Sequence, residues 1–206
     1  MTLNHSVSIC TALVFAARSC SLASRKTRSA IFTLLLATGL VGGFATTSQA
    51  APEVGGTYYT QYNFWAEKEK SATTNYSRGE LIPFNTQVEL VSMDKKKFVI
   101  SANGRQLQII NKPKYTMRSS PEVAAEMLKK QQVNLAGVGK DRQSDMRNGI
   151  LRLGMTKEQT IITRGYPPRH KTPSTEANRW IYWASRFVQL TLVFENGKLS
   201  QGRGLY

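Results

Sequence analysis

Cysteine and histidine are the two residue types that this 206-residue sequence has least of. Both cysteines, Cys10 and Cys20, lie near the N-terminus, so residues 51–206 contain none. A disulfide framework, a thiolate nucleophile and a Cys-ligated metal are therefore excluded for that part of the chain. The same part has one histidine, His170, so a zinc site would need a cluster of carboxylates. The sequence shows no such cluster, and we expect no metal and no cofactor.

Acidic residues are also scarce. The sequence has 28 Lys and Arg against 13 Asp and Glu, a net charge of +15. The first fifty residues hold four basic side chains and no acidic one, which leaves +11 for residues 51–206. Such an excess attracts polyanions through electrostatic steering and counterion release. A soluble basic surface without a specific ligand explains the same charge equally well.

The N-terminus has the order of a secretory signal. Arg25-Lys-Thr-Arg28 is basic, Ala30–Phe44 is apolar and free of charge, and Ser48-Gln49-Ala50 supplies small residues for a signal peptidase. The apolar run is too short to span a hydrocarbon core of ~30 Å. We therefore predict a signal peptide over residues 1–50, cleaved after Ala50, and a periplasmic protein. The alternative is an uncleaved segment that anchors the protein in the inner membrane.

Residues 51–118 show the pattern of several short strands. Asn103-Gly104 lies between two of them and is a strong signal for a two-residue hairpin turn. The stretch Ala66–Glu80 is polar, and we expect a connection there. Short strands with tight turns predict a small β-rich domain over residues 51–118, either an SH3-like barrel or a curled sheet. The expected strands are Thr57–Trp65, Thr86–Val91, Lys97–Ser101 and Gln106–Ile110.

A capped helix is predicted to begin the second part of the chain. Ser119 can cap it, and Glu122 three residues later completes a capping box. An apolar stripe runs along Pro121–Lys130, and Gly137–Asp145 then forms a polar connection. We place a domain boundary in this helical region. Residues 119–206 are then a second domain, to which this helix supplies an apolar layer.

The last fifty residues predict another capped helix and three strands. Thr156 and Gln159 form a second capping box, and Gly165 suits the position that follows a helix end. Asn196-Gly197 predicts a tight turn between the last two strands. The expected fold is α+β, with one clearly buried sheet face formed by Val188, Leu190, Leu192 and Phe194. The expected strands are Arg179–Trp183, Val188–Phe194 and Lys198–Gln201.

Four short motifs in this region together resemble a known domain. They are Gly154-Met155-Thr156, Gly165-x-Pro167, Trp180-x-Tyr182 and Phe194-x-Asn-Gly-Lys198. Over roughly residues 149–200 the sequence resembles the SmpA/OmlA (BamE-like) domain. Its best-known members are small outer-membrane lipoproteins of the machinery that assembles β-barrels. The resemblance implies two helices followed by a three-stranded antiparallel sheet, and a location in the cell envelope.

The sequence departs from those lipoproteins in two ways. It has no cysteine next to the predicted cleavage site at Ala50, so the lipid anchor is missing. A separate β-rich block, residues 51–118, also precedes the BamE-like part. Membership of the assembly machinery therefore does not carry over with the resemblance.

His170 is the first residue to weigh as a catalytic group. It lies between Arg169 and Lys171 on a loop rich in proline. A Ser/His/acid triad would need it buried and oriented by a carboxylate. The nearest acid in sequence is Glu176, and no Gly-x-Ser-x-Gly motif occurs. We therefore expect an exposed loop residue and not a catalytic base.

Other patterns that could carry chemistry are weaker still. Gly137-Val-Gly139-Lys140 has part of a phosphate-loop pattern but lacks the full spacing, so a flexible turn is the better interpretation. The pairs Glu67 with Glu69 and Asp141 with Asp145 lie in segments rich in Lys and Arg, where solvated ion pairs are expected. We therefore assign no catalytic, cofactor-binding or metal-ligating residue.

Two aromatic groups allow two interpretations. The residues from Tyr58 to Trp65 could stack on sugars or bases, with nearby lysines holding phosphates. Strand alternation instead places about half of them in a core, which we favour. In Trp180-Ile-Tyr-Trp183 at least one tryptophan is expected to fill the interface between sheet and helix. The other is then available to a partner.

These observations predict an exported cell-envelope protein that acts by binding and not by catalysis. The expected partner is another envelope protein or an anionic envelope surface, and no nucleic acid is expected in the periplasm. One alternative is a secreted binder of polyanions such as anionic lipid or lipopolysaccharide. A less favoured alternative is a hydrolase of cell-wall material, for which the sequence shows no assembled pair of acid and base.

Overall fold

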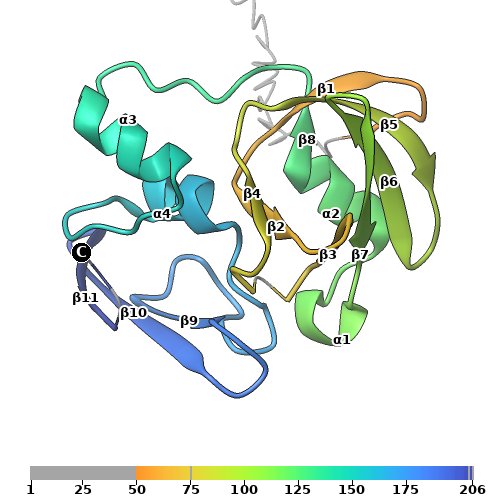
Figure 1. The fold of residues 1–206 in the computed structure, drawn as a ribbon. Coiled ribbons are helices and arrows are strands. Elements are labelled where there is room, and N and C mark those ends of the chain that lie inside the picture. The colour runs from red at the N-terminus through yellow and green to blue at the C-terminus, as the bar shows by residue number, and fades with distance from the viewer. Residues whose placement is uncertain (1–49, 75, 204, 206) are drawn as a thin grey trace, which may run out of the picture. The chain divides into compact units, whose positions relative to one another are not determined.

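The structure is a computed structural model that describes residues 50–74, 76–203 and 205 (Figure 1). The predicted signal peptide lies outside the described residues, apart from Ala50. The described residues belong to one compact unit with an α+β fold. Within these ranges, no helix combines the length and the apolar character needed to cross a membrane.

The largest sheet has six strands in the order β3-β7-β6-β5-β1-β8. Its neighbours are antiparallel except β3 and β7, which run parallel. Asn103 and Gly104 both have positive φ, 50° and 76°, and they close the predicted hairpin between β6 and β7. The strands curve instead of lying flat (Figure 1). Their bounds are Thr57–Thr60 for β1, Lys70–Ala72 for β3, Gln87–Met93 for β5, Lys97–Ala102 for β6, Arg105–Ile110 for β7 and Leu128–Lys129 for β8.

The first predicted strand, Thr57–Trp65, is divided in two. The chain leaves β1 after Thr60 and enters β2 (Phe64–Ala66), which pairs with β4 (Glu80–Ile82) in a separate antiparallel sheet. The polar stretch Ala66–Glu80 was expected to be a connection, yet it contains β3. Ser71 at the centre of β3 is buried and pairs with Ile109. A strand with one buried polar side chain has no apolar alternation for a sequence pattern to detect.

The helix at Ser119 is confirmed at its start and is shorter than predicted at its end. α2 (Ser120–Met127) follows α1 (Pro113–Thr116), and its capping box between Ser119 and Glu122 is complete. Leu128 and Lys129 leave the helix to form β8, which pairs with β1. The hydrogen bonds of this edge pairing end the helix before Lys130.

Two further helices precede the second sheet. α4 (Lys157–Arg164) has the predicted capping box of Thr156 with Gln159, and Gly165 ends it at φ 82°. α3 (Lys140–Arg147) was not predicted, because Gly137–Asp145 was expected to be a polar connection. This helix contacts α4 and has a single buried side chain, Met146. One apolar residue gives no helical periodicity, which is why the prediction was wrong.

The second sheet is antiparallel, in the order β11-β10-β9. The turn at Asn196-Gly197 joins β10 to β11, as predicted, with φ of 50° and 73°. Leu192 and Phe194 are buried, whereas Val188 is 47% exposed and lies outside the expected buried face. The bounds are Arg179–Trp183 for β9, Gln189–Glu195 for β10 and Lys198–Gly202 for β11.

Apolar side chains gather in two cores. The first holds the inner residues of the six-stranded sheet together with Val123, Ala124 and Met127 of α2. The second lies between α3, α4 and the three-stranded sheet, with Trp180 at 0% exposure. The expectation that the helix at Ser119 supplies a layer to the second core is therefore wrong. The second core instead takes Phe84 from the β-rich part.

Candidate functional site

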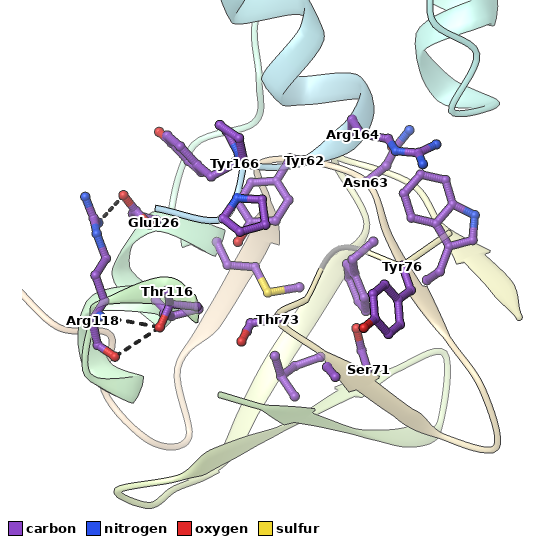
Figure 2. Close-up of a pocket in the computed structure, with 18 of the residues that line it drawn as sticks. Tyr62, Asn63, Ser71, Thr73, Tyr76, Thr116, Arg118, Glu126, Arg164 and Tyr166 are labelled. Carbon is purple, nitrogen blue, oxygen red and sulfur yellow. Dashed lines mark hydrogen bonds and ion pairs between the residues drawn. The ribbon is translucent and has the colours of Figure 1, made fainter. Parts of the chain in front are cut away.

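A mainly apolar pocket opens beside the six-stranded sheet (Figure 2). Its free volume is about 60 Å³, so it is narrow, although it exceeds the ~10–15 Å³ that one water molecule needs. Its wall comes from β2, β3, α2 and the segment that follows α4. The apolar and aromatic lining includes Tyr62, Trp65, Met127, Tyr166, Pro167 and Pro168.

The segment after α4 reaches the pocket because Gly165 turns the chain there. Its φ of 82° is in the left-handed region that favours glycine. A Cβ at this position would lie 3.1 Å from the ring of Tyr62, so a side chain would crowd that ring. Pro167 and Pro168 follow and forbid a further helical turn. The Gly/Pro pattern noted in the sequence thus forms one wall of the pocket.

Tyr62 and Tyr166 pack edge to face at one side of the pocket. Their ring centroids are 5.8 Å apart and the rings are inclined by 84°, a favourable geometry for an aromatic pair. Burial raises the pKa of both phenols, and the nearby carboxyl of Glu126 raises them further. Both side chains therefore stay neutral over the physiological range.

Arg118 and Glu126 form an ion pair at the pocket wall, as the dashed line in Figure 2 shows. The carboxyl side chain is 20% exposed and the guanidinium 21%. Burial raises the pKa of Glu126 to about 7, Arg118 opposes that rise, and Glu122 adds to it. Glu126 therefore exchanges its proton near neutral pH while it lies beside a fixed positive charge.

Arg164 is the second charged group of the pocket and lies on its other side (Figure 2). Its guanidinium carbon is 5.3 Å from the centroid of the Trp65 ring, a cation–π arrangement. Burial lowers its pKa, and its Nε is buried with no hydrogen-bond partner among the described residues. A buried N–H without an acceptor is costly, so a small side-chain movement that lets a ligand oxygen reach this atom would relieve that cost.

Asn63 fixes the back of the pocket. Its side-chain nitrogen donates to the carbonyl oxygens of Met146 at 2.6 Å and Thr163 at 3.0 Å. Its side-chain oxygen accepts from the backbone N–H of Phe84 at 2.8 Å. One buried amide thus holds β-rich residues against the ends of α3 and α4, and it sets the position of Arg164.

His170 was predicted to be an exposed loop residue, and it is half-buried instead. Its ring lies 4.9 Å from that of Tyr115 and 6.3 Å from that of Trp183, which is parallel to it within 5°. Among the described residues, its side chain thus contacts aromatic rings and not a carboxylate. The structure provides no triad around His170 among the described residues.

The other sequence candidates lie apart from the pocket. Lys140 and Asp141 begin α3, where no phosphate loop forms. Asp145 is paired with Arg152 at 3.0 Å. Glu67 and Glu69 are exposed on the turn before β3. Among the described residues, no group of three or more His, Cys, Asp and Glu could hold a metal ion.

The aromatic residues divide as the favoured interpretation predicts. Tyr58 and Phe64 are buried in the first core, whereas Tyr62 and Trp65 are half-buried and line the pocket. No sequence pattern pointed to three of the charged residues of the pocket, which are Arg118, Glu126 and Arg164. Each lies in an ordinary helical or loop context, and only the fold brings them together. The only local sequence signal that belongs to the pocket is the pair of prolines after Gly165, because Pro167 and Pro168 form part of its wall.

Comparisons of the chain with protein-family models, with curated proteins and with solved structures find no match.

Proposed function

We propose that this protein is a non-enzymatic binding module of the cell envelope, and that its pocket holds a small, slender apolar group with an anionic end. The observation that carries the proposal is the unpaired, buried guanidinium nitrogen of Arg164. Its guanidinium lies over Trp65 in an apolar pocket, and its buried Nε has no acceptor. A ligand carboxylate, or another anionic oxygen, would supply that acceptor through a charge-assisted hydrogen bond.

The balance of charge in the pocket supports an anionic ligand. Its lining contains three guanidinium groups, from Arg118, Arg164 and Arg169. Among the described residues that line it, the one carboxylate is Glu126, and Arg118 already pairs with that group. Arg164 and Arg169 therefore leave an excess of positive charge at the pocket, and an anionic group would lower the repulsion between them.

Binding explains the pocket better than hydrolysis does. Most glycosidases need two carboxyl groups on opposite sides of the scissile bond. Glu126 has the raised pKa of a general acid, but it has no carboxylate partner across the pocket among the described residues. The cell-wall hydrolase that remained an alternative in the sequence analysis is therefore the weaker candidate.

The envelope location rests on the predicted signal peptide and on the resemblance to the BamE-like domain. Two helices, α3 and α4, precede the antiparallel sheet β11-β10-β9, although the first of the two helices expected from the sequence was the one at Ser119 and not α3. We propose a BamE-like arrangement for this part, with the β-rich residues as an addition that completes the pocket. An envelope protein could then present the anionic apolar group, for example as an exposed peptide terminus.

The test is a binding titration with a matched pair of probes. Propanoate carries a short apolar chain and a carboxylate, and propanamide has nearly the same shape without the charge. Isothermal titration calorimetry measures both, and the change in tryptophan fluorescence, to which Trp65 contributes, is a second readout. We expect the acid to bind about tenfold or more tightly than the amide, because a hydrogen bond to a charged group contributes about 1.5–3 kcal/mol.

Two arginine variants provide the control. Arg164→Gln should remove the preference for the acid, whereas Arg179→Gln changes an exposed arginine of β9 and should keep it. Equal affinity for acid and amide in the unaltered protein would overturn the proposal. Turnover of cell-wall fragments, lost in Glu126→Gln, would instead support the hydrolase.

A further inference from the structure

A second surface of the molecule, separate from the pocket, gathers lysines. Lys95 and Lys96 form the turn between β5 and β6, and Lys97 begins β6. Together with Lys70 of β3 they surround a shallow depression whose floor contains Gln108 and Ile110 of β7. We call these four lysines and that floor the lysine depression.

Strand pairing explains why Lys70 joins the other three. Lys97 lies opposite Ile110, and Lys70 lies opposite Gln108 on the far side of β7. Two strand spacings, about 10 Å, separate β6 from β3, and the two lysines are also offset by two residues along β7. Phe98, Ile109 and Ser71 are buried, so alternation directs their neighbours in each strand to the outer face. Four positive charges thus share one side of the sheet.

Hydrogen bonds to its backbone carbonyl oxygens fix the turn that carries Lys95 and Lys96. The hydroxyl of Ser120, which is fully buried at the start of α2, donates to the carbonyl oxygen of Lys95 at 2.9 Å. The backbone N–H of Asn111 donates to the carbonyl oxygen of Lys96 at 2.8 Å. Because both carbonyl oxygens are hydrogen-bonded, the backbone that carries the two lysines has a fixed position.

Within the part of the chain that the structure describes, these charges are not neutralised. Among the described residues, none of the four lysines forms an ion pair, and the depression has one acidic side chain, Asp94. The local excess is therefore about three positive charges within a few strand spacings. Like charges held this close repel one another, so a surface of negative charges would stabilise them.

We propose that the lysine depression docks on the phosphate groups of an anionic phospholipid surface. None of its described lining residues is aromatic, so it lacks the stacking platform by which proteins bind single-stranded nucleic acid. Its ammonium groups lie on flexible stems around a shallow, partly apolar floor, which suits an array of headgroups better than one enclosed ligand. The attraction of basic segments to anionic bilayers is about 1 kcal/mol for each lysine near the surface.

The experiment compares two triple variants of the full chain that lose the same charge. One is Lys95→Ala with Lys96→Ala and Lys97→Ala, and the other changes the exposed Lys140, Lys171 and Lys198 to alanine. Sedimentation with phosphatidylcholine vesicles, with and without phosphatidylglycerol, measures the partition coefficient. Both variants keep the N-terminus of the unaltered chain, so any contribution from residues 1–50 cancels.

We expect the first variant to bind the anionic vesicles about 100-fold more weakly than the unaltered chain. Each of the three lysines contributes about fivefold to the affinity, and the three factors multiply. The second should lose much less, and neither should bind the neutral vesicles more weakly than the unaltered chain. A third variant with arginine at positions 95, 96 and 97 should restore binding, which separates lost charge from damaged folding.

Three results would overturn the proposal. Equal losses in the two alanine variants would mean that net charge alone governs binding. An unchanged affinity in the first variant would exclude the lysine depression. Binding to soluble inorganic polyphosphate that depends on the same lysines, without binding to anionic vesicles, would assign the surface to a soluble polyanion.

Discussion

The side-chain nitrogen of Asn63 donates a hydrogen bond of 3.0 Å to the backbone carbonyl oxygen of Thr163, one hundred residues away in sequence. The same nitrogen donates to Met146, and the side-chain oxygen accepts from Phe84. One buried amide therefore uses both donors and its acceptor to join the β-rich residues to α3 and α4. Asn63 thus couples the β-rich part to the second core.

Asn63→Ala should lower the free energy of unfolding by about 2–4 kcal/mol. The substitution leaves the N–H of Phe84 and the carbonyl oxygen of Thr163 without partners, and each unpaired buried group costs about 1–3 kcal/mol. Urea unfolding followed by tryptophan fluorescence measures the change. Asn148→Ala is the control, because that exposed amide makes one long hydrogen bond of 3.5 Å to Ser144. A similar loss in both variants would contradict the role of Asn63.

A fragment that begins at Ser119 should not fold cooperatively, although the sequence pattern suggested that residues 119–206 form a domain. α2 buries Val123 and Met127 in the first core, so the fragment would expose that apolar face. It would also lack Phe84 from the second core, together with Asn63. Circular dichroism during thermal unfolding tests this on the fragment, with the full chain as reference. A sharp, reversible transition of the fragment would show that the second domain is independent.

Local signals in the sequence predicted the element boundaries well where a specific backbone conformation is needed. The two Asn-Gly turns and the two capping boxes are confirmed, because positive φ and unpaired N–H groups each demand particular residue types. Trp180 is fully buried, as expected for the side chain that fills the second core. These features depend on a few neighbouring residues, and such residues are visible in one sequence.

Features that depend on distant partners were missed. β3 is stabilised by its pairing with β7, and β8 exists because β1 offers it an edge. The pocket takes Trp65, Glu126 and Arg164 from three separate segments, so no spacing in the sequence could indicate it. The sequence also placed α2 in the wrong core. An apolar stripe on a helix does not reveal which sheet it packs against, and α2 packs in the first core.

Trp180→Ala should be among the most destabilising single substitutions, at about 3–5 kcal/mol. The indole is fully buried, its ring centroid is 4.5 Å from that of Phe194, and its N–H donates to the carbonyl oxygen of Ala177 at 2.8 Å. Trp183 is the matched control, since it is half-buried on the same strand and stacks on His170. Its replacement by alanine should cost at most about 1–2 kcal/mol. Equal losses in denaturant titrations would contradict this difference.

Glu126 and Glu122 lie four residues apart on α2 and should give stability opposite dependences on pH. Burial raises the pKa of Glu126 to about 7, from about 4.3 in an unfolded chain. Between these values the folded protein keeps a proton that the unfolded chain has lost, so stability falls as pH rises. Hydrogen bonds from the side chain and the backbone of Ser119 lower the pKa of Glu122. Its contribution is therefore present above the unfolded pKa and is lost as pH falls.

Urea unfolding from about pH 2.5 to pH 8 separates the two carboxyl groups, because the contribution of Glu122 changes below its unfolded pKa of about 4.3 and that of Glu126 changes above it. The difference in unfolding free energy between the unaltered chain and Glu126→Gln should fall by about 2–3 kcal/mol as pH rises from about 4.3 to about 7, less any screening at this partly exposed site. The groups that act on Glu126 are Arg118, Glu122 and Lys129, and all of them remain in this variant. Glu122→Gln should show a difference that rises with pH, because the protonated carboxyl no longer accepts from Ser119. A flat difference for Glu126→Gln across this range would mean that its carboxyl is solvated, and the pocket would then lose its titrating group.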